Sequence, residues 1–125
     1  MPSFATTRHV PFSAAEMFAL VADVEHYLEF LPLCTGLSVI SRRAAGDGEE
    51  LTARMDVGYK SISESFTTRV VTFPVEKRIE VAYLDGPFKH LDNRWTFIDD
   101  ASGSTIDFFI DYEFRSRLLG VLVGQ

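Results

Sequence analysis

Residues 12–34 read FSAAEMFALVADVEHYLEFLPLC, a stretch that predicts a capped amphipathic helix near the start of the chain. Ser13 and Glu16 have the spacing of a capping box, in which each side chain accepts a hydrogen bond from the backbone N–H of the other residue. Pro32 disfavours helix at the residue before it, so the helical stretch ends there. The apolar residues between them recur at helical spacing: Met17, Val21, Val24 and Leu28.

A second, shorter helical turn is expected inside the same stretch. Asp23 can cap this turn, and Tyr27, Phe30 and Leu31 then share one face of it. A short turn has little room to bury three large apolar side chains. Two interpretations stay open: the three residues complete the core, or they form an apolar gate at the entrance of a cavity.

The pattern after residue 37 changes from helical spacing to alternation. In residues 51–57, LTARMDV, every second residue is apolar, which is typical of a half-buried strand. Pro74 marks a break between two such strands, and the DDASG sequence at 99–103 predicts a hairpin loop. Strands are expected at 6–10, from 37 onward, and at 51–57, 64–73, 77–84, 93–98 and 104–114. Because short loops join these roughly seven strands, we expect an antiparallel sheet.

The last expected strand has one apolar face that needs a cover. Ile106, Phe108, Ile110 and Tyr112 are two positions apart, so they lie on one side of the sheet, and the acidic residues Asp107, Asp111 and Glu113 lie on the other. The chain then ends in RSRLLGVLVGQ at 115–125, whose leucines and valine have the spacing of the first turns of a helix. We expect this final helix to be incomplete here.

Composition limits the classes of protein that the chain resembles. Its 125 residues fit one domain, 1–125, and 46% of them are apolar, including 11 phenylalanines. The formal net charge of −6 disfavours binding to DNA, because such binding depends on lysine and arginine. Cys34 is the single cysteine, so no intrachain disulfide can form. No signal-peptide pattern is present, and a cytoplasmic protein, perhaps peripheral to the inner membrane, is expected.

Catalytic and metal-binding motifs are missing from the sequence. It contains no nucleophile elbow, no HExxH zinc motif and no phosphate loop. His9, His26 and His90 fall on different expected elements, so no metal site and no catalytic residue is assigned. Cys34 is read as small apolar filler beside Leu33, and the acidic pair Asp99–Asp100 as a solvated turn.

Aromatic residues are unusually frequent on the expected strand faces. They are Phe66, Tyr83, Trp95, Phe97, Phe108 and Tyr112. Each by itself is explained by an ordinary core. Together, on a sheet that curls around one helix, they favour an incompletely filled apolar cavity of the kind that binds small molecules.

Four stretches carry a resemblance to a known family: VPFSAAEMFALVADVEHYLEFLPLC, ESFTTRVVTFP, GPFKHLDNRWTF and DYEFRSRLL. They resemble the ubiquinone-binding, START-like group of polyketide cyclase/dehydrase and oligoketide cyclase/lipid transport proteins. The resemblance implies an α+β helix-grip fold, similar to START and Bet v 1 domains. In it a coiled antiparallel sheet of about seven strands, with two short helices after the first strand, grips a long C-terminal helix across an apolar tunnel.

The resemblance also implies a function. The family includes mitochondrial proteins that bind ubiquinone and support respiration, and bacterial proteins described in the same way or as ribosome-associated toxins; this chain resembles the bacterial kind. We therefore expect a lipid carrier, not an enzyme, with ubiquinone or a related isoprenoid lipid as ligand and no cofactor. The residues expected to bind the ligand are Tyr27, Phe30, Leu31, Met55, Phe66, Arg69, Tyr83, Trp95, Phe97, Phe108 and Tyr112. Among them Arg69, Tyr83, Trp95 and Tyr112 are candidate partners of the quinone head.

Two alternatives remain open at this point. A ribosome-associated protein that binds the large subunit and blocks subunit association would need a basic surface, for which Lys60, Arg69, Arg94, Arg115 and Arg117 are candidates. A polyketide cyclase would need acid–base groups inside the cavity, and the sequence offers none that can be placed there.

Overall fold

The computed structural model describes residues 3–24, 34–59 and 62–118, which form one helix and seven strands. The helix α1 spans Ala14–Ala22 and follows the first strand, as the sequence predicts. The strands are β1 (Ser3–Val10), β2 (Cys34–Ala45), β3 (Gly48–Tyr59), β4 (Ile62–Phe73), β5 (Arg78–Asp85), β6 (Phe88–Asp100) and β7 (Gly103–Phe114). The break at Pro74 and the hairpin after Asp100 are confirmed.

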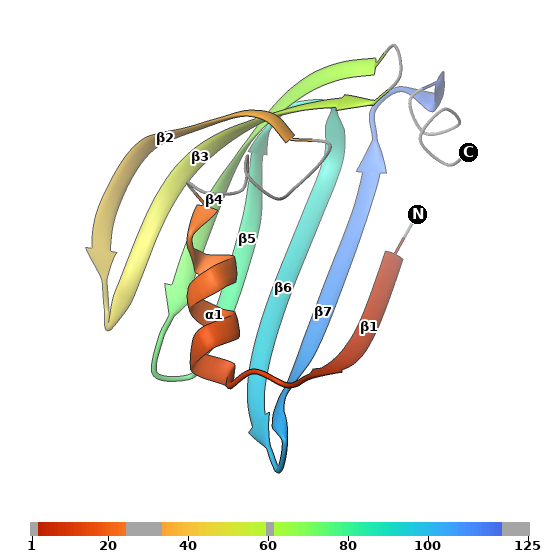
Figure 1. Cartoon of the computed structure of the whole chain (residues 1–125). Helices are drawn as coiled ribbons and strands as arrows, with labels where there is room; N and C mark the ends of the chain where they lie inside the picture. Colours follow the sequence, from red (N-terminus) through yellow and green to blue (C-terminus); the bar gives the residue numbers. More distant parts are fainter. Residues whose placement is uncertain (1–2, 25–33, 60–61, 119–125) are drawn as a thin grey trace.

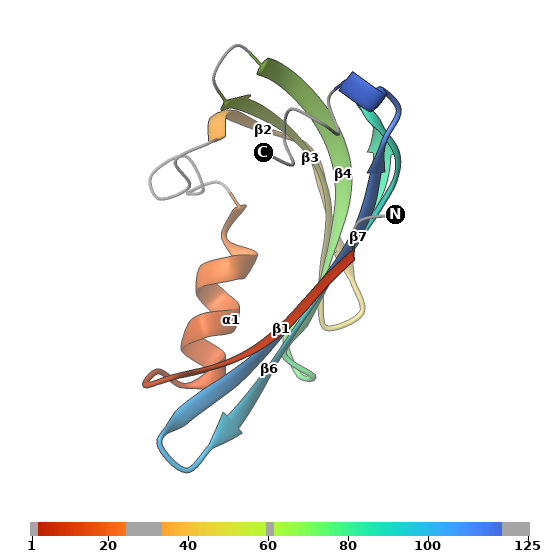
Figure 2. The same cartoon turned by 90° about the vertical axis from the view of Figure 1, so that its right-hand side faces the viewer.

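All seven strands belong to one antiparallel sheet in the order β1-β7-β6-β5-β4-β3-β2. Strands β2 to β7 are neighbours in chain order, from β2 beside β3 to β6 beside β7. Strand β1 lies at the far edge, beside β7. The sheet is strongly curved, and α1 lies on its concave side (Figures 1 and 2). The predicted α+β architecture, a coiled antiparallel sheet with a helix against one face, is confirmed.

Three carboxylate or hydroxyl groups fix the start of α1. The Glu16 amide donates to Ser13 Oγ at 3.1 Å and the Ser13 amide donates to Glu16 Oε1 at 3.2 Å, which confirms the capping box. In addition, Asp99 Oδ1 accepts a hydrogen bond of 2.8 Å from the Ala14 amide. Since these amides have no partner inside the helix, the three bonds stabilise its start, and the bond to Asp99 also fastens α1 to the end of β6.

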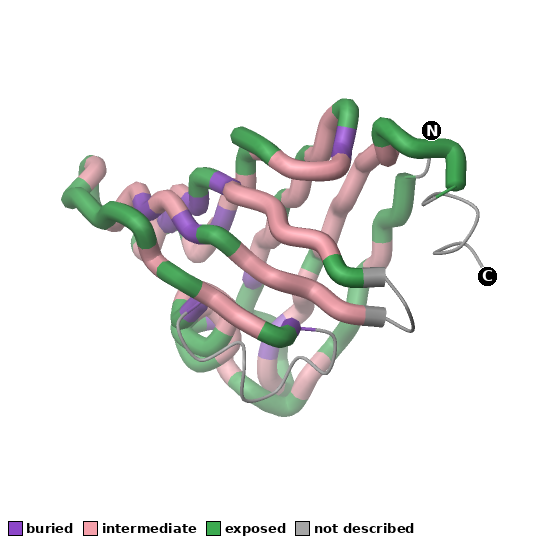
Figure 3. Tube along the Cα trace, turned by 90° about the horizontal axis from the view of Figure 1, so that it is seen from above, coloured by how far each residue is buried: buried purple, intermediate pink, exposed green. Residues whose placement is uncertain are grey.

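The core lies between α1 and the half of the concave face that is drawn lower in Figure 1. Its fully or almost fully buried residues come from α1, the residues just after it, and β3 to β6, as the buried segments in Figure 3 show. The Phe18 ring packs edge-on against Phe97, with centroids 6.0 Å apart. The buried members are Ala14, Val24, Leu51, Ala53, Val70, Ile79 and Phe97.

Two expected helices cannot be compared with the structure over most of their length. The turn that would carry Tyr27, Phe30 and Leu31 lies outside the described residues. At the other end, only residues 117 and 118 of the expected final helix are described, and both are helical. Within the described ranges, no helix combines the length and the apolar character needed to cross a membrane.

Candidate ligand-binding cavity

A cavity of about 170 Å³ opens on the concave face beyond the C-terminal end of α1. Val24 forms part of its wall from the helix side, and six strands, β2 to β7, supply the rest. Alternate residues of a strand face the same side. A strand that contributes more than one residue to the wall therefore contributes residues two positions apart. The lining residues are Val24, Leu37, Ala53, Met55, Phe66, Thr68, Val70, Ile79, Val81, Leu91, Asn93, Trp95 and Ile110.

The wall of this cavity is almost wholly apolar. Among the lining residues that the structure describes, Thr68, Asn93 and the Trp95 indole carry polar groups, and none has an ionisable side chain. Asn93 Nδ2 donates to the Phe109 carbonyl at 2.9 Å, and Asn93 Oδ1 accepts from Trp95 Nε1 at 2.9 Å. These two bonds hold the indole ring at a fixed angle in the wall.

One aromatic group lies beside the cavity toward α1. Trp95 stacks in parallel on Phe97 at 6.1 Å between centroids, and Phe108 packs edge-on against Trp95 at 4.7 Å. The register explains this arrangement, since Trp95 on β6 lies directly opposite Phe108 on β7. Phe4 from β1 then packs against Phe108 at 6.1 Å.

A second aromatic group lies at the other end of the concave face and is centred on Phe88. Phe66, Tyr83 and Tyr112 each pack edge-on against the Phe88 ring at 5.6–6.0 Å, and Phe114 stacks on it at 4.8 Å. The Phe88 amide donates to Tyr83 Oη at 3.0 Å. Phe66 belongs both to this group and to the cavity wall, so the apolar surface continues from the cavity into the aromatic group.

The structure brings most of the predicted ligand residues to the concave face. Met55, Phe66 and Trp95 line the cavity itself. Phe97 lies deeper, in the core under α1, while Phe108, Tyr83 and Tyr112 belong to the two flanking aromatic groups. Contact of any of them with a ligand stays a prediction.

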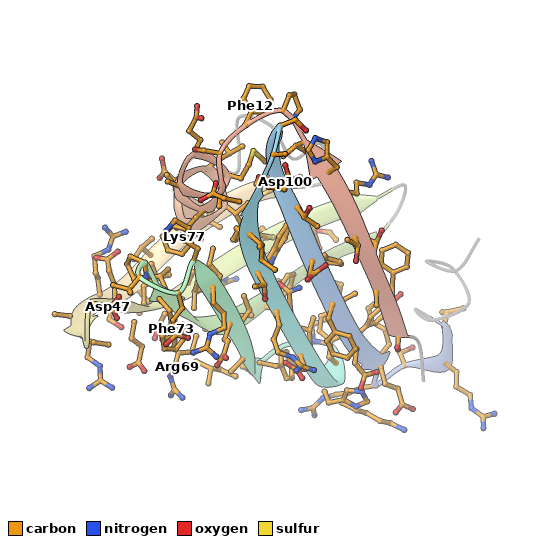
Figure 4. All side chains as sticks on the ribbon, turned by 90° about the horizontal axis from the view of Figure 1, so that it is seen from below. Phe12, Asp47, Arg69, Phe73, Lys77 and Asp100 are labelled. Atoms are coloured by element: carbon orange, nitrogen blue, oxygen red, sulfur yellow. The ribbon has the colours of Figure 1, made fainter. Side chains whose placement is uncertain are left out.

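Arg69 is not brought to the cavity. It lies between Thr68 and Val70, which both line the cavity, and therefore points to the convex side. Figure 4 shows its side chain on the side of the sheet away from α1. There its guanidinium lies 3.9 Å from Glu50. The candidate role of Arg69 as a partner for a buried quinone head is thus corrected by the two-residue period of β4.

The sequence analysis did not assign most of the aliphatic wall, nor either polar residue in it. Alternation along β4 and β5 would have found Val70, Ile79 and Val81, because they share a face with Phe66 and Tyr83. Asn93 is two residues before Trp95 and therefore on the same face. Leu37 and Leu91 follow β-bulges in β2 and β6, which change the alternation, so their orientation was not readable from spacing.

A polar cluster joins the ends of β1 and β6 outside the cavity. Asp100 Oδ2 accepts from His9 Nδ1 at 2.7 Å and from Thr105 Oγ1 at 2.8 Å, and Asp100 Oδ1 accepts from the Ser102 amide at 3.1 Å. Burial of the carboxyl raises its pKa, but the hydrogen bonds from Thr105 and Ser102 and the bond and charge of His9 outweigh this, so the pKa of Asp100 is lowered. The Asp99–Asp100 pair is therefore structural, not simply solvated.

Ser102 Oγ also lies 3.1 Å from His9 Nε2, so Ser102, His9 and Asp100 follow one another in the order of a catalytic triad. The Ser102 amide, however, is bonded to Asp100 and not free to stabilise an oxyanion. Figure 4 places Asp100 beside Phe12, at the end of the molecule where β1 leads into α1. We read this cluster as a link between β1 and the β6–β7 hairpin.

The convex face carries charges of both signs. Arg43 and Arg69 both approach Glu50, Arg78 binds Glu80 at 2.7 Å, and Arg94 Nη2 lies 3.5 Å from Asp92. In the described ranges, no group of three or more histidine, cysteine, aspartate or glutamate side chains is arranged to hold a metal ion. Cys34 is buried, as expected for apolar filler.

Comparison with known proteins assigns the family. The family model described as polyketide cyclase / dehydrase and lipid transport matches residues 10–125. The chain belongs to this family. It is 36% identical over 126 residues to the ribosome association toxin RatA of Escherichia coli K12, covering all of this chain and 77% of the toxin. It is 29% identical over 120 residues to the mitochondrial coenzyme Q-binding protein COQ10 homolog B of Xenopus laevis, covering 92% of this chain and 47% of that protein.

Solved structures of similar proteins agree with the fold. An 18 kDa protein of Caulobacter crescentus superposes with a TM-score of 0.82 at 32% identity, over 99% of this chain and 84% of that one. A START superfamily protein of Mycobacterium smegmatis superposes with a TM-score of 0.72 at 23% identity, over 98% and 86% of the two chains. The likeness to the START superfamily confirms the predicted helix-grip fold.

Proposed function

We propose that this protein binds an apolar small molecule, ubiquinone or a related isoprenoid lipid, in the cavity on its concave face and carries it without transforming it. The observation that carries the proposal is the cavity itself, to which every strand from β2 to β7 contributes at least one apolar side chain. The similarity to a coenzyme Q-binding protein supports the choice of ligand.

The size of the cavity suggests how much of the ligand it holds. An apolar cavity of about 150 Å³ stays dry and accepts a benzene-sized molecule, whereas complete small-molecule sites measure about 300–1,000 Å³. The 170 Å³ here therefore suits one ring or one branched segment of the ligand. The rest would lie along the Phe88 aromatic group, where each methylene removed from water contributes about 0.8 kcal/mol.

The chemistry of the wall favours carriage over catalysis. General acid–base catalysis needs a titratable side chain within hydrogen-bond reach of the reacting atom. The 13 lining residues in the described part of the chain offer none. This supports a binding role over a cyclase role for the cavity. A carrier of this type would load and unload its ligand at a membrane surface.

Trp95 makes the proposal directly testable, since it is the single tryptophan of the chain and lines the cavity. Titration with decylubiquinone should quench its fluorescence in a saturable manner, because a quinone in contact with an indole is an efficient quencher. Mass spectrometry of lipids extracted from the protein purified out of a ubiquinone-containing host should find quinone. Absence of both signals would overturn the proposal.

A matched pair of variants places the binding site. Ala53→Leu adds a side chain into the cavity from β3 and should reduce decylubiquinone affinity while leaving the fold intact, because the adjoining space accepts the added atoms. Thr52→Leu makes a similar addition at the neighbouring position, which faces the convex side, and should leave affinity unchanged. Equal effects of the two variants would place the ligand elsewhere.

A second candidate function is association with the large ribosomal subunit. It is favoured by one observation, the 36% identity to the RatA toxin over the whole of this chain. Arg69 and Arg94 on the convex face are candidate contacts, although each lies near an acidic partner. Cosedimentation with ribosomes that weakens as salt rises, and that is reduced by Arg94→Glu but not by Ala53→Leu, would support this function.

A further inference from the structure

Thr68 brings to the cavity wall a hydroxyl that no other described residue satisfies. Its side chain lies in the middle of β4, retains 7% of its accessible surface and lines the cavity. Its neighbours on the same face are Ala53 on β3, Tyr83 on β5, and Phe66 and Val70 along β4. None of the hydrogen bonds within the described part of the chain involves the Thr68 hydroxyl.

The other buried polar groups of this region are paired, which sets Thr68 apart. Thr72, on the same face of the same strand, accepts from the Glu49 amide at 3.0 Å and approaches the Glu49 carbonyl at 3.4 Å. Asn93, which pairs with Val81 of β5, is bonded to Trp95 and to the Phe109 carbonyl. The Thr68 hydroxyl is thus an unused donor in an apolar wall, so a ligand atom that pairs with it gains binding energy.

We propose that the Thr68 hydroxyl donates a hydrogen bond to a carbonyl oxygen of the bound molecule, so that the cavity selects an apolar ring carrying a ketone or quinone oxygen over a pure hydrocarbon. This inference rests on the proposed function, since it concerns the same cavity. Thr68 then determines which ligands are preferred, while the aliphatic wall accepts any apolar group of suitable size.

The inference predicts opposite effects of one substitution. Thr68→Val keeps the shape of the side chain and removes the hydroxyl. Without ligand the variant should unfold at a temperature a few degrees higher than the wild type, because a hydroxyl without a protein partner in an apolar wall has been replaced by a methyl group. The variant should bind a ketone ligand more weakly than the wild type does. The expected loss is roughly 2- to 12-fold, which corresponds to the free energy of one net hydrogen bond.

Acetophenone and ethylbenzene are suitable probes, because each has a benzene-sized ring and they differ in the carbonyl group. Their affinities are measured by NMR titration of the wild type, Thr68→Val and Thr67→Val. Thr67 is the matched control: it undergoes the same chemical change one position earlier on β4, on the opposite face of the sheet. We expect the ratio of the acetophenone affinity to the ethylbenzene affinity to be the same in wild type and Thr67→Val, and to fall by roughly 2- to 12-fold in Thr68→Val.

The outcomes separate this inference from the function on which it rests. If the wild type binds decylubiquinone but Thr68→Val keeps the wild-type ratio of the two probe affinities, the inference fails and the proposed function stands. If Thr68→Val is less stable and binds both probes more weakly to the same extent, Thr68 has a structural role and the inference also fails. If the wild type binds none of the three compounds, both are overturned.

Discussion

Asn93 holds the indole of Trp95 in the cavity wall through a hydrogen bond of 2.9 Å from Nε1 to Oδ1. Both residues lie on the concave face of β6, and the Asn93 amide is itself fixed by its bond to the Phe109 carbonyl on β7. Because an amide has both a donor and an acceptor, one side chain satisfies a neighbouring indole and an adjacent strand. The orientation of the largest ring in the cavity thus depends on a residue that is not aromatic.

Replacing Asn93 with leucine should destabilise the protein by about 1–3 kcal/mol, since a half-buried indole N–H and a backbone carbonyl lose their partners. Urea unfolding measures the change. The double variant Asn93→Leu, Trp95→Phe tests the cause: if the loss comes from the unsatisfied indole, the two substitutions together should cost less than the sum of their separate costs. Strict additivity would contradict the assigned role of Asn93.

Asp99 is expected to stabilise α1 from outside the helix. It accepts from the Ala14 amide at 2.8 Å, at the positive end of the helix dipole. Asp99→Ala should therefore lower the free energy of unfolding by about 0.5–2 kcal/mol, the usual cost of a lost helix cap. Asp85 is an exposed aspartate at the end of β5 whose side chain makes no ion pair or hydrogen bond within the described residues, so Asp85→Ala serves as the control and should change stability little. Equal effects would show that Asp99 acts only through net charge.

Stability should depend on the ionisation of Asp100. Its pKa is lowered in the folded protein, so the ionised form is favoured by folding. A carboxyl of this kind contributes stability at pH values above its unfolded pKa, and the contribution is lost as pH falls through the folded pKa. Asp100→Asn should therefore lower the melting temperature at neutral pH, and the difference from wild type should shrink in acid. A difference that stays constant across the acid range would contradict the prediction.

Gly103 should tolerate no side chain. Its φ of 153° lies outside the range that side chains favour, and an added Cβ would collide with the Val10 carbonyl and with Pro11. Gly46 also has a positive φ, 58°, but nothing lies near the position of its Cβ. Gly46→Ala should cost roughly 1–2 kcal/mol from backbone strain alone, and Gly103→Ala clearly more. Thermal unfolding compares the two; equal costs would mean that β1 moves aside without penalty.

The sequence by itself determined the elements and most of their faces. The capping box of Ser13 and Glu16 fixed the start of α1, because its partners are three residues apart in the chain. Strict alternation placed Phe108 and Tyr112 on one face of β7, as the register confirms. The same rule excludes Arg69 from the face of Phe66, since the two differ by an odd number of positions on a regularly paired strand. The prediction that Arg69 contacts the ligand rested on its charge and conflicts with this alternation.

Only the tertiary structure decided which side chains meet across strands. Asp99 and Ala14 are 85 residues apart, and His9 and Asp100 are 91 apart, so no local spacing announces either contact. Extra residues in β2, β5 and β6 shift the register of their pairs and change which residues face the cavity. The unpaired state of Thr68 depends on its neighbours on β3 and β5. Spacing along the chain specifies the direction of a side chain, but its surroundings depend on strand register and sheet curvature, which form only when distant segments pack together.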